Sequence, residues 1–198
     1  MKYILALPFL LTLLLTGCAS YEITDTGRAL RTEDQYFEIV QKNSDRTTRY
    51  SGLYNVLEMQ ATLLSSEVLE AQLDQKTRIY LWDDNKFQTE KNLVAKRLST
   101  ETEFFLSFFT PEKKNDDLGT PKTLWKTFLD VEGRRYEGKV IRIKSALAEL
   151  TSLYPTHNRF YTAYSLIFPV SEKSIEGKEM KITVTGPVGS GTLNFNKK

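Results

Sequence analysis

The sequence predicts a mainly β domain with a helical insertion: an α+β protein built as an antiparallel β-sandwich with an immunoglobulin-like layout. Apolar and polar side chains alternate in several short segments, which is the period of half-buried strands. Glycine and proline separate these segments, most clearly over residues 186–191. Apolar residues at helical spacing are concentrated in residues 66–98, and this spacing predicts the insertion.

Four segments are predicted to be strands of one sheet system: residues 102–109, 124–131, 160–168 and 180–195. The first is almost continuously apolar, which is typical of a central strand covered on both faces. Phe105 and Ile182 are therefore expected core positions. A further extended segment is expected within residues 49–64, with Leu53 on its apolar side.

Helices are predicted over residues 33–42, 66–98 and 145–154. Ser65 or Ser66 can cap the second region, because a hydroxyl accepts a hydrogen bond from the free amides of a first turn. The polar run at residues 83–85 divides that region into two helices. Pro155 ends the last helix, since the residue before a proline avoids the helical conformation.

An apolar run near the amino terminus ends in Leu15-Thr16-Gly17-Cys18. This segment resembles the lipobox of bacterial lipoproteins at each position that defines the motif. The resemblance implies that residues 1–17 are a signal peptide, that it is cut before Cys18, and that Cys18 is acylated on its thiol and its new amino group. The alternatives are an ordinary secretory leader with an incidental cysteine and a transmembrane anchor.

Acylation implies a durable membrane attachment, because two or more acyl chains hold a protein far longer than one. In this lipoprotein class an aspartate after the cysteine favours retention in the inner membrane. The residue here is Ala19, so the expected location is the outer membrane. Residues 18–32 are polar and aperiodic and are expected to be a lipidated tether, followed by a single globular domain over residues 33–198.

Charge and cysteine content argue against a nucleic-acid-binding protein and against a protein stabilised by disulfides or by cysteine-bound metal. The chain has 27 basic and 25 acidic residues, and the two signs are interspersed. Nucleic acid is therefore not an expected partner. Cys18 is the single cysteine, so its acylation leaves no thiol for a disulfide or a metal ligand.

No arrangement of residues predicts catalysis, a metal site or a cofactor. His157 is the only histidine, and its setting after Pro155-Thr156 predicts a surface loop. A zinc site needs more nitrogen or sulfur ligands than the mature chain offers. The acidic runs at residues 83–85 and 115–117 lack the spacing of a calcium loop and are expected to be solvated or to cap helices.

Aromatic residues near predicted loop ends suggest a binding surface. Tyr154 and Tyr161, together with Tyr136, are expected to present amphipathic side chains to a partner, with burial in the core as the alternative. The expected function is that of a non-enzymatic envelope lipoprotein that binds or scaffolds an envelope protein. The alternative is a lipid-anchored hydrolase of a cell-envelope glycan or peptide, in which a carboxylate pair would act.

The order of the last predicted elements is similar to that of small bacterial lipoproteins that end in a strand, a Gly-Pro-rich turn and a strand. This resemblance covers the C-terminal half of the chain. It implies a β-rich domain and no particular activity.

Overall fold

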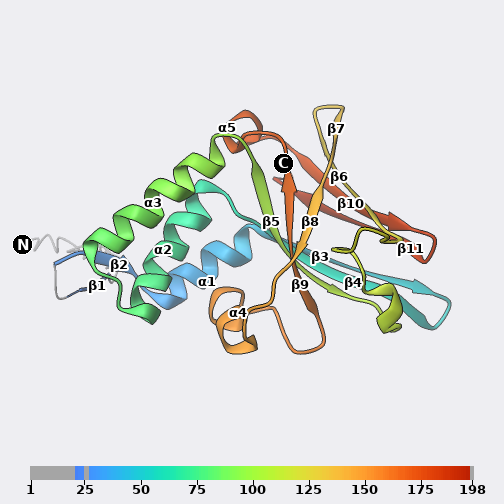
Figure 1. Cartoon of the computed structure of the whole chain (residues 1–198), viewed down its shortest axis with the longest axis horizontal. Coiled ribbons are helices and arrows are strands. Elements are labelled where there is room, and N and C mark those ends of the chain that lie inside the picture. The colour runs from blue at the N-terminus through green and yellow to red at the C-terminus, as the bar shows by residue number, and fades with distance from the viewer. Residues whose placement is uncertain (1–20, 25–26, 197–198) are drawn as a thin grey trace, which may run out of the picture.

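The computed structural model describes residues 21–24 and 27–196. The lipobox, Cys18 and Ala19 lie outside the described residues. The described chain is a mixed α+β protein whose sheets are antiparallel, with the three long helices at one end and the two larger sheets at the other (Figure 1).

Two sheets make up most of the β structure. The five-stranded sheet has the order β3 (Ser44–Ser51), β4 (Tyr54–Leu63), β5 (Thr102–Phe109), β9 (Thr162–Phe168) and β8 (Lys139–Arg142). The four-stranded sheet has the order β11 (Gly189–Phe195), β10 (Met180–Gly186), β6 (Lys126–Val131) and β7 (Arg134–Glu137).

All four predicted strand segments contain strands in the structure. Residues 102–109 are β5, which is central and buried on both faces. Residues 124–131 and 160–168 contain β6 and β9, each beginning two residues later than predicted. Residues 180–195 form the β10–β11 hairpin, whose register pairs Gly186 with Gly189, so the turn is shorter than the glycine-rich run suggested.

The main core lies between the facing sides of the two sheets. Phe104, Leu106 and Phe108 of β5 meet Ile182 of β10 and Leu193 of β11, and all five side chains are fully buried. The Phe104 ring meets the Phe168 ring edge-on at a centroid distance of 5.9 Å. Alternate residues of each strand enter this core, which explains why apolar and polar residues alternate in these segments of the sequence.

Gly138 lets the chain pass from one sheet to the other between β7 and β8. A Cβ atom at this position would lie 2.6 Å from Cε1 of Phe168 and 2.8 Å from Oγ1 of Thr127. The backbone amide of Gly138 donates to the carbonyl oxygen of Thr127 at 2.9 Å. The sheets therefore approach closely at this corner because the residue there has no side chain.

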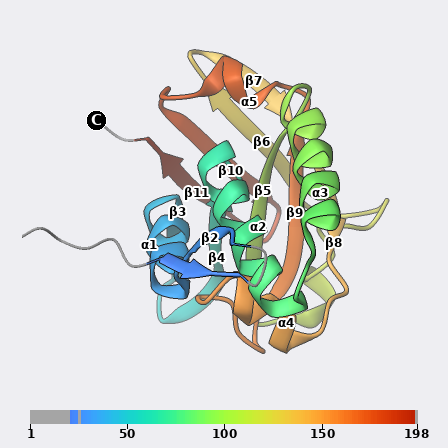
Figure 2. The ribbon, with the colours of Figure 1, turned by 90° about the vertical axis from the view of Figure 1, so that its left-hand side faces the viewer.

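The helices are α1 (Glu33–Lys42), α2 (Ser66–Tyr80), α3 (Asp84–Leu98), α4 (Leu147–Leu153) and the short α5 (Glu172–Ile175). A second core forms where α1, α2 and α4 cover the outer face of the five-stranded sheet, around Phe105 (Figure 2). Ser65 caps α2 and Asp83 caps α3, so the predicted break at residues 83–85 is confirmed. A 3-10 turn, η1 (Lys113–Asn115), precedes β6.

The expected tether is wrong for the residues that the structure describes. Strands β1 (Tyr21–Ile23) and β2 (Ala29–Arg31) pair as an antiparallel hairpin. Leu30 is buried, and Arg31 Nη1 donates to the Asp74 carboxylate of α2 at 2.7 Å. The folded part therefore begins ahead of residue 33. Strands of three residues are too short for periodicity to reveal.

Candidate functional site

His157 is buried, which contradicts its expected place in a surface loop. Its relative exposure is 4%, and its Nδ1 atom lies 2.8 Å from the Ser107 hydroxyl oxygen, within hydrogen-bond distance. The ring meets Phe105 edge-on at 5.6 Å. Burial lowers the pKa of His157, so the imidazole is neutral near pH 7.

The Ser107–His157 pair has the residue types of a nucleophile and its base, but its setting does not suit acyl transfer. Ser107 belongs to the central strand β5 and is almost completely buried. Among the described residues, no carboxylate hydrogen-bonds to His157 to orient it. A cavity of about 290 Å³ adjoins the ring, with Arg142, Arg159 and Tyr161 among its lining residues. The pair thus satisfies two buried polar groups inside the fold.

Tyr154 does not form part of an exposed surface, contrary to expectation. It is buried, and its ring stacks on Phe105 at a centroid distance of 3.5 Å. The Gln72 amide donates to the Tyr154 hydroxyl at 3.1 Å and lies 3.5 Å from the Tyr36 hydroxyl. The alternative of core burial is therefore correct for Tyr154, because α4 ends by turning this ring onto the outer face of β5.

Tyr161 is half-buried and is tied to the five-stranded sheet. Its hydroxyl donates to the Glu58 carboxylate, which also pairs with Arg46. Burial and the carboxylate raise the pKa of Tyr161 to about 12. Tyr136 is also partly buried and packs against the main core. The three tyrosines therefore do not form one exposed surface.

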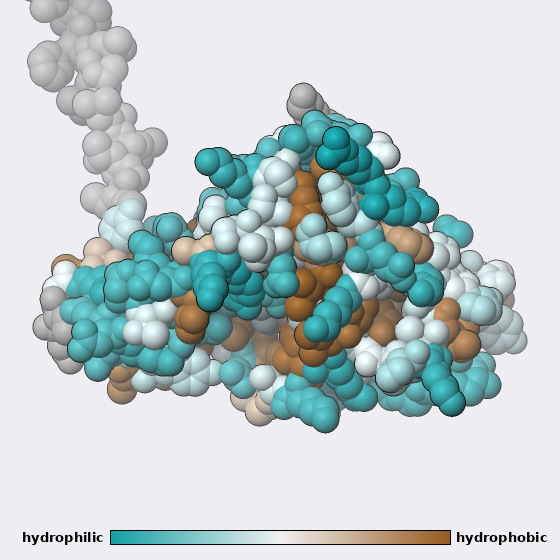
Figure 3. Space-filling view, turned by 45° about the horizontal axis from the view of Figure 1, so that its top comes forward, coloured by the Kyte–Doolittle hydropathy of each residue, from teal (hydrophilic) through white to brown (hydrophobic). Residues whose placement is uncertain are grey.

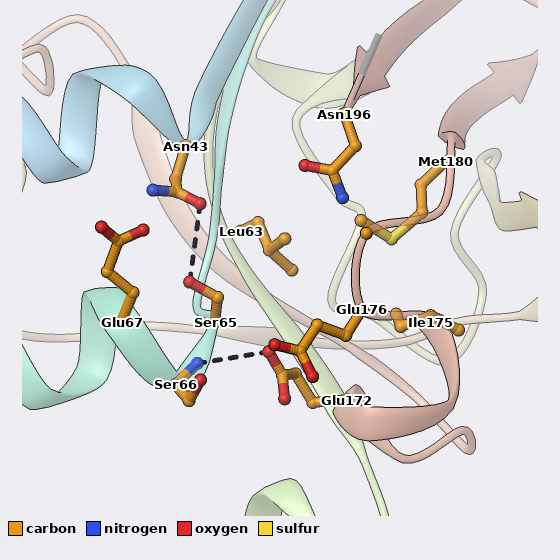
Figure 4. Close-up of a pocket in the computed structure, with 11 residues that line it drawn as sticks. Asn43, Leu63, Ser65, Ser66, Glu67, Glu172, Ile175, Glu176, Met180 and Asn196 are labelled. Carbon is orange, nitrogen blue, oxygen red and sulfur yellow. Dashed lines mark hydrogen bonds between the residues drawn. The ribbon is translucent and has the colours of Figure 1, made fainter. Parts of the chain in front are cut away.

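A small cavity of about 150 Å³ lies at the start of α2 (Figure 4). Glu172 and Glu176 reach towards Ser66 from the α5 side, and the Ser66 backbone amide donates to Glu172 at 3.4 Å. Carboxylates are favourable here because the first amides of a helix carry partial positive charge. The Ser66–Glu172 hydrogen bond therefore links α2 to α5 beside the cavity. The polar side chains that line it are largely hydrogen-bonded within the fold.

A second polar cavity, of about 310 Å³, lies between β2, α2 and α3. The Arg28 guanidinium lies over the Phe87 ring, 3.6 Å from its centroid, and also pairs with Asp84. Arg31 in the same cavity pairs with Asp74. Both arginines of this cavity are therefore paired with carboxylates.

A polar cluster on the outer face of the five-stranded sheet was not expected from the sequence. The Ser165 hydroxyl donates to Glu103 at 2.6 Å, and Arg97 of α3 pairs with the same carboxylate at 3.0 Å. Lys76 of α2 has its pKa lowered mainly by burial and next by Arg97. The cluster ties α3 to the sheet, although the residues 84–98 of that helix include none that is fully buried.

The described part of the chain lacks two features, a cluster of metal-ligand side chains and a helix that could span a membrane. In residues 21–24 and 27–196, no three histidine, cysteine or carboxylate side chains are grouped as metal ligands would be. Within the same ranges no helix has the length and apolar character of a membrane span.

The tip of the β3–β4 hairpin carries Leu53, the most exposed large apolar side chain in the described chain. Leu53 is 97% exposed and Tyr54 is 81% exposed, and Tyr50 beside them is also exposed. Leu53 was expected on the apolar side of a strand, but Gly52, with φ of 61°, starts a turn there. That glycine was the available signal for a hairpin. We call Tyr50, Leu53 and Tyr54 the hairpin tip.

Other apolar side chains are exposed elsewhere on the surface. Figure 3 shows hydrophobic side chains gathered in a band across the middle of the face seen there, with hydrophilic ones on both sides. Apolar atoms make up much of any folded surface, so exposure of apolar side chains does not by itself define a site. In the hairpin tip, two adjacent side chains, Leu53 and Tyr54, are both more than 80% exposed.

Comparison with known proteins identifies no family. No family model and no curated protein matches the chain. One solved structure, a novel protein of unknown function from Burkholderia pseudomallei K96243, is similar at 12% sequence identity and a TM-score of 0.42. The match covers 84% of this chain and 90% of that one.

Proposed function

We propose that this protein is a non-enzymatic lipoprotein of the bacterial envelope, anchored in the outer membrane through acyl chains on Cys18, and that it acts by binding or scaffolding an envelope protein. The lipobox and Ala19 support the anchor and its location. We also infer that the two sheets form a β-sandwich, supported by the core that they share. The five-stranded sheet carries helices on its outer face, which departs from an immunoglobulin-like layout.

The observation that carries the binding function is the exposure of the hairpin tip. Neighbouring Leu53 and Tyr54 lie at the end of a hairpin, where their burial by a partner would be favourable by about 1.5–3 kcal/mol for a fully buried leucine-sized side chain. Figure 1 places the β3–β4 turn and β1, the first described strand, at opposite ends of the molecule. A chain anchored at Cys18 therefore holds the hairpin tip away from the anchored end.

Photo-crosslinking in intact cells tests this function. A crosslinking amino acid replaces Leu53 in the full chain, and in a matched control it replaces Leu93, an exposed leucine of α3. We expect a discrete crosslinked protein from position 53 that is absent from position 93. Combined Leu53→Ser and Tyr54→Ser changes should then reduce capture by about tenfold or more, as loss of ~1.4 kcal/mol or more implies.

Equal crosslinking from both positions, or none from position 53, would contradict a role for the hairpin tip. Unchanged capture by the doubly substituted protein would do the same. Both serine substitutions are at exposed positions, so the free energy of unfolding should change by less than about 0.5 kcal/mol. A urea titration checks that the loss of capture is not a loss of folding.

A further inference from the structure

Strand β1 and the carboxyl end of α2 lie at the end of the molecule where the described chain begins, the end that faces the viewer in Figure 2, and both carry exposed apolar side chains. Tyr21 and Ile23 belong to β1. Ile79 and Tyr80 end α2, and Leu81 follows them. We call these five residues the N-terminal apolar end.

The geometry of the β1–β2 hairpin directs two of these side chains away from the domain. Glu22 lies opposite the buried Leu30 in the strand register, and its carboxylate accepts from Arg78 Nε at 2.5 Å. Side chains alternate along a strand, so Tyr21 and Ile23 project from the opposite face. Ile23 is 75% exposed.

Leu81 is the most unusual member of the N-terminal apolar end. It caps the carboxyl end of α2 with φ of 50°, in the left-handed region, and it is 87% exposed. Glycine or asparagine is the common choice at such a position, because a larger side chain is strained there. A leucine is thus unfavourable for the isolated domain in both backbone strain and exposure. This combination indicates a contact outside the domain.

Ion pairs hold the β1–β2 hairpin against α2 and α3. Glu22 pairs with Arg78 in the last turn of α2, and Arg28 pairs with Asp84 in the first turn of α3. Trp82 adds an aromatic ring beside Leu81, stacked on Tyr80 at a centroid distance of 6.0 Å. Amphipathic aromatic rings next to apolar side chains are typical of the boundary between water and lipid.

The chain length places this surface next to the anchor. Cys18 precedes Tyr21 by three residues. A fully extended chain covers at most about 3.3–3.6 Å per residue, so about 10 Å is the longest separation of their Cα atoms. Apolar faces of interfacial segments sink about 5–10 Å into the headgroup region. Acyl chains on Cys18 therefore bring the N-terminal apolar end within reach of the bilayer surface.

We propose that the N-terminal apolar end lies in the boundary between headgroups and acyl chains, where β1 and the α2–α3 turn contact lipid directly. This inference rests on the proposed acylation of Cys18, and it adds a second, non-covalent contact that orients the domain. The hairpin tip then points away from the membrane. Arg78 and Arg28 are each paired with a carboxylate, so the contact does not depend on anionic lipid.

Depth-dependent quenching tests the proposal. Acylation blocks the thiol of the single native cysteine, so an introduced cysteine is the only one that a fluorophore can label. Full-length Leu81→Cys, Ile23→Cys and Leu53→Cys proteins are labelled and placed in phosphatidylcholine vesicles with brominated acyl chains. We expect several-fold stronger quenching by the brominated lipid at positions 81 and 23 than at position 53, and the reverse order with aqueous iodide. Mass spectrometry of each sample reports the acylation of Cys18.

Each outcome decides between the proposals. Acylated protein with equal lipid quenching at all three positions would overturn the lipid contact and leave the anchor intact. Labels at positions 81 and 23 that are shielded from both quenchers would overturn it as well, since a second copy or another protein would then cover this end. An unmodified Cys18 would overturn both the anchor and this inference.

Discussion

Single residues acquire their roles from burial in this protein. Tyr154 ends a predicted helix just before Pro155, and His157 lies in the predicted loop after it. Both side chains nevertheless lie inside the second core or at its edge. The loop returns to the outer face of β5, where Phe105 and Ser107 contact these two side chains. The Phe105 ring stacks on the Tyr154 ring, and the Ser107 hydroxyl lies within hydrogen-bond distance of the His157 imidazole.

The burial of His157 predicts a pH-dependent stability. Above about pH 6.5 the imidazole is neutral in both the folded and the unfolded chain and contributes nothing that depends on pH. Below that pH the unfolded chain binds a proton that the folded ring resists, because burial lowers the pKa of His157. The free energy of unfolding should therefore fall on acidification, by up to about 1.4 kcal/mol for each unit of pKa difference.

Urea titrations at about pH 7.5 and about pH 5.5 measure this effect, with His157→Gln as the comparison, because glutamine can still bond to Ser107 and does not titrate. The variant should lose less stability on acidification than the wild type. An identical loss in both proteins would mean that His157 is solvated. If His157→Gln stayed folded and abolished the cellular role, the hydrolase alternative would gain support.

The positions of individual strands depend on side-chain size as well as on the alternation of apolar and polar residues. Strand β7 leads into β8 through Gly138, and the chain changes sheets at that residue. At the opposite edge, a Cβ atom at Gly191 of β11 would lie 2.7 Å from Cε of Met59 of β4, so glycine also lets the two sheets approach there. The closeness of the sheets thus depends on residues that contribute no side chain.

A Gly138→Ala substitution should test this dependence on the corner. The added methyl group would contact the Phe168 ring and the Thr127 hydroxyl, so one of them must shift. We expect a loss of about 1–3 kcal/mol in the free energy of unfolding, as is typical of overpacked sites. Lys139→Ala at the next, exposed position is the matched control and should change stability by less than about 0.5 kcal/mol. Urea denaturation of both variants makes the comparison, and equal stabilities would show that the corner tolerates a side chain.

The described part of the molecule has two exposed apolar ends with different proposed contacts. The N-terminal apolar end adjoins the proposed anchor, and the hairpin tip lies at the far end of the long axis (Figure 1). The ion pairs Glu22–Arg78 and Arg31–Asp74 join the β1–β2 hairpin to α2. The anchor is thus proposed to attach to a folded element, and this attachment limits how freely the domain can turn on the membrane.

Substitution of the proposed anchor residue tests whether the protein is attached to the membrane through Cys18. Cys18→Ser removes the thiol that acylation requires, so incorporation of labelled palmitate should be lost and the product should be unprocessed or soluble. Fractionation of cells and intact mass measurement report both effects. Unchanged membrane retention together with unchanged mass would contradict the lipoprotein assignment.

The sequence by itself determined the elements that depend on local pattern. Strands β5, β6, β9 and the β10–β11 hairpin are legible because alternate residues enter one core, and α1, α2 and α3 because their caps and apolar spacing are local. The lipobox is likewise a continuous motif. Its assignment stays a prediction, since Cys18 lies outside the described residues.

The tertiary structure alone decided which aromatic and polar side chains are covered. Tyr154 and Leu53 were expected in the wrong environments, because exposure depends on contacts between residues far apart in the chain. Tyr154 is buried by Phe105 and Gln72, whereas Leu53 projects from a turn to which no described segment returns. The candidate surfaces of this protein are therefore set by where the chain folds back, and a local period carries no information about such long-range contacts.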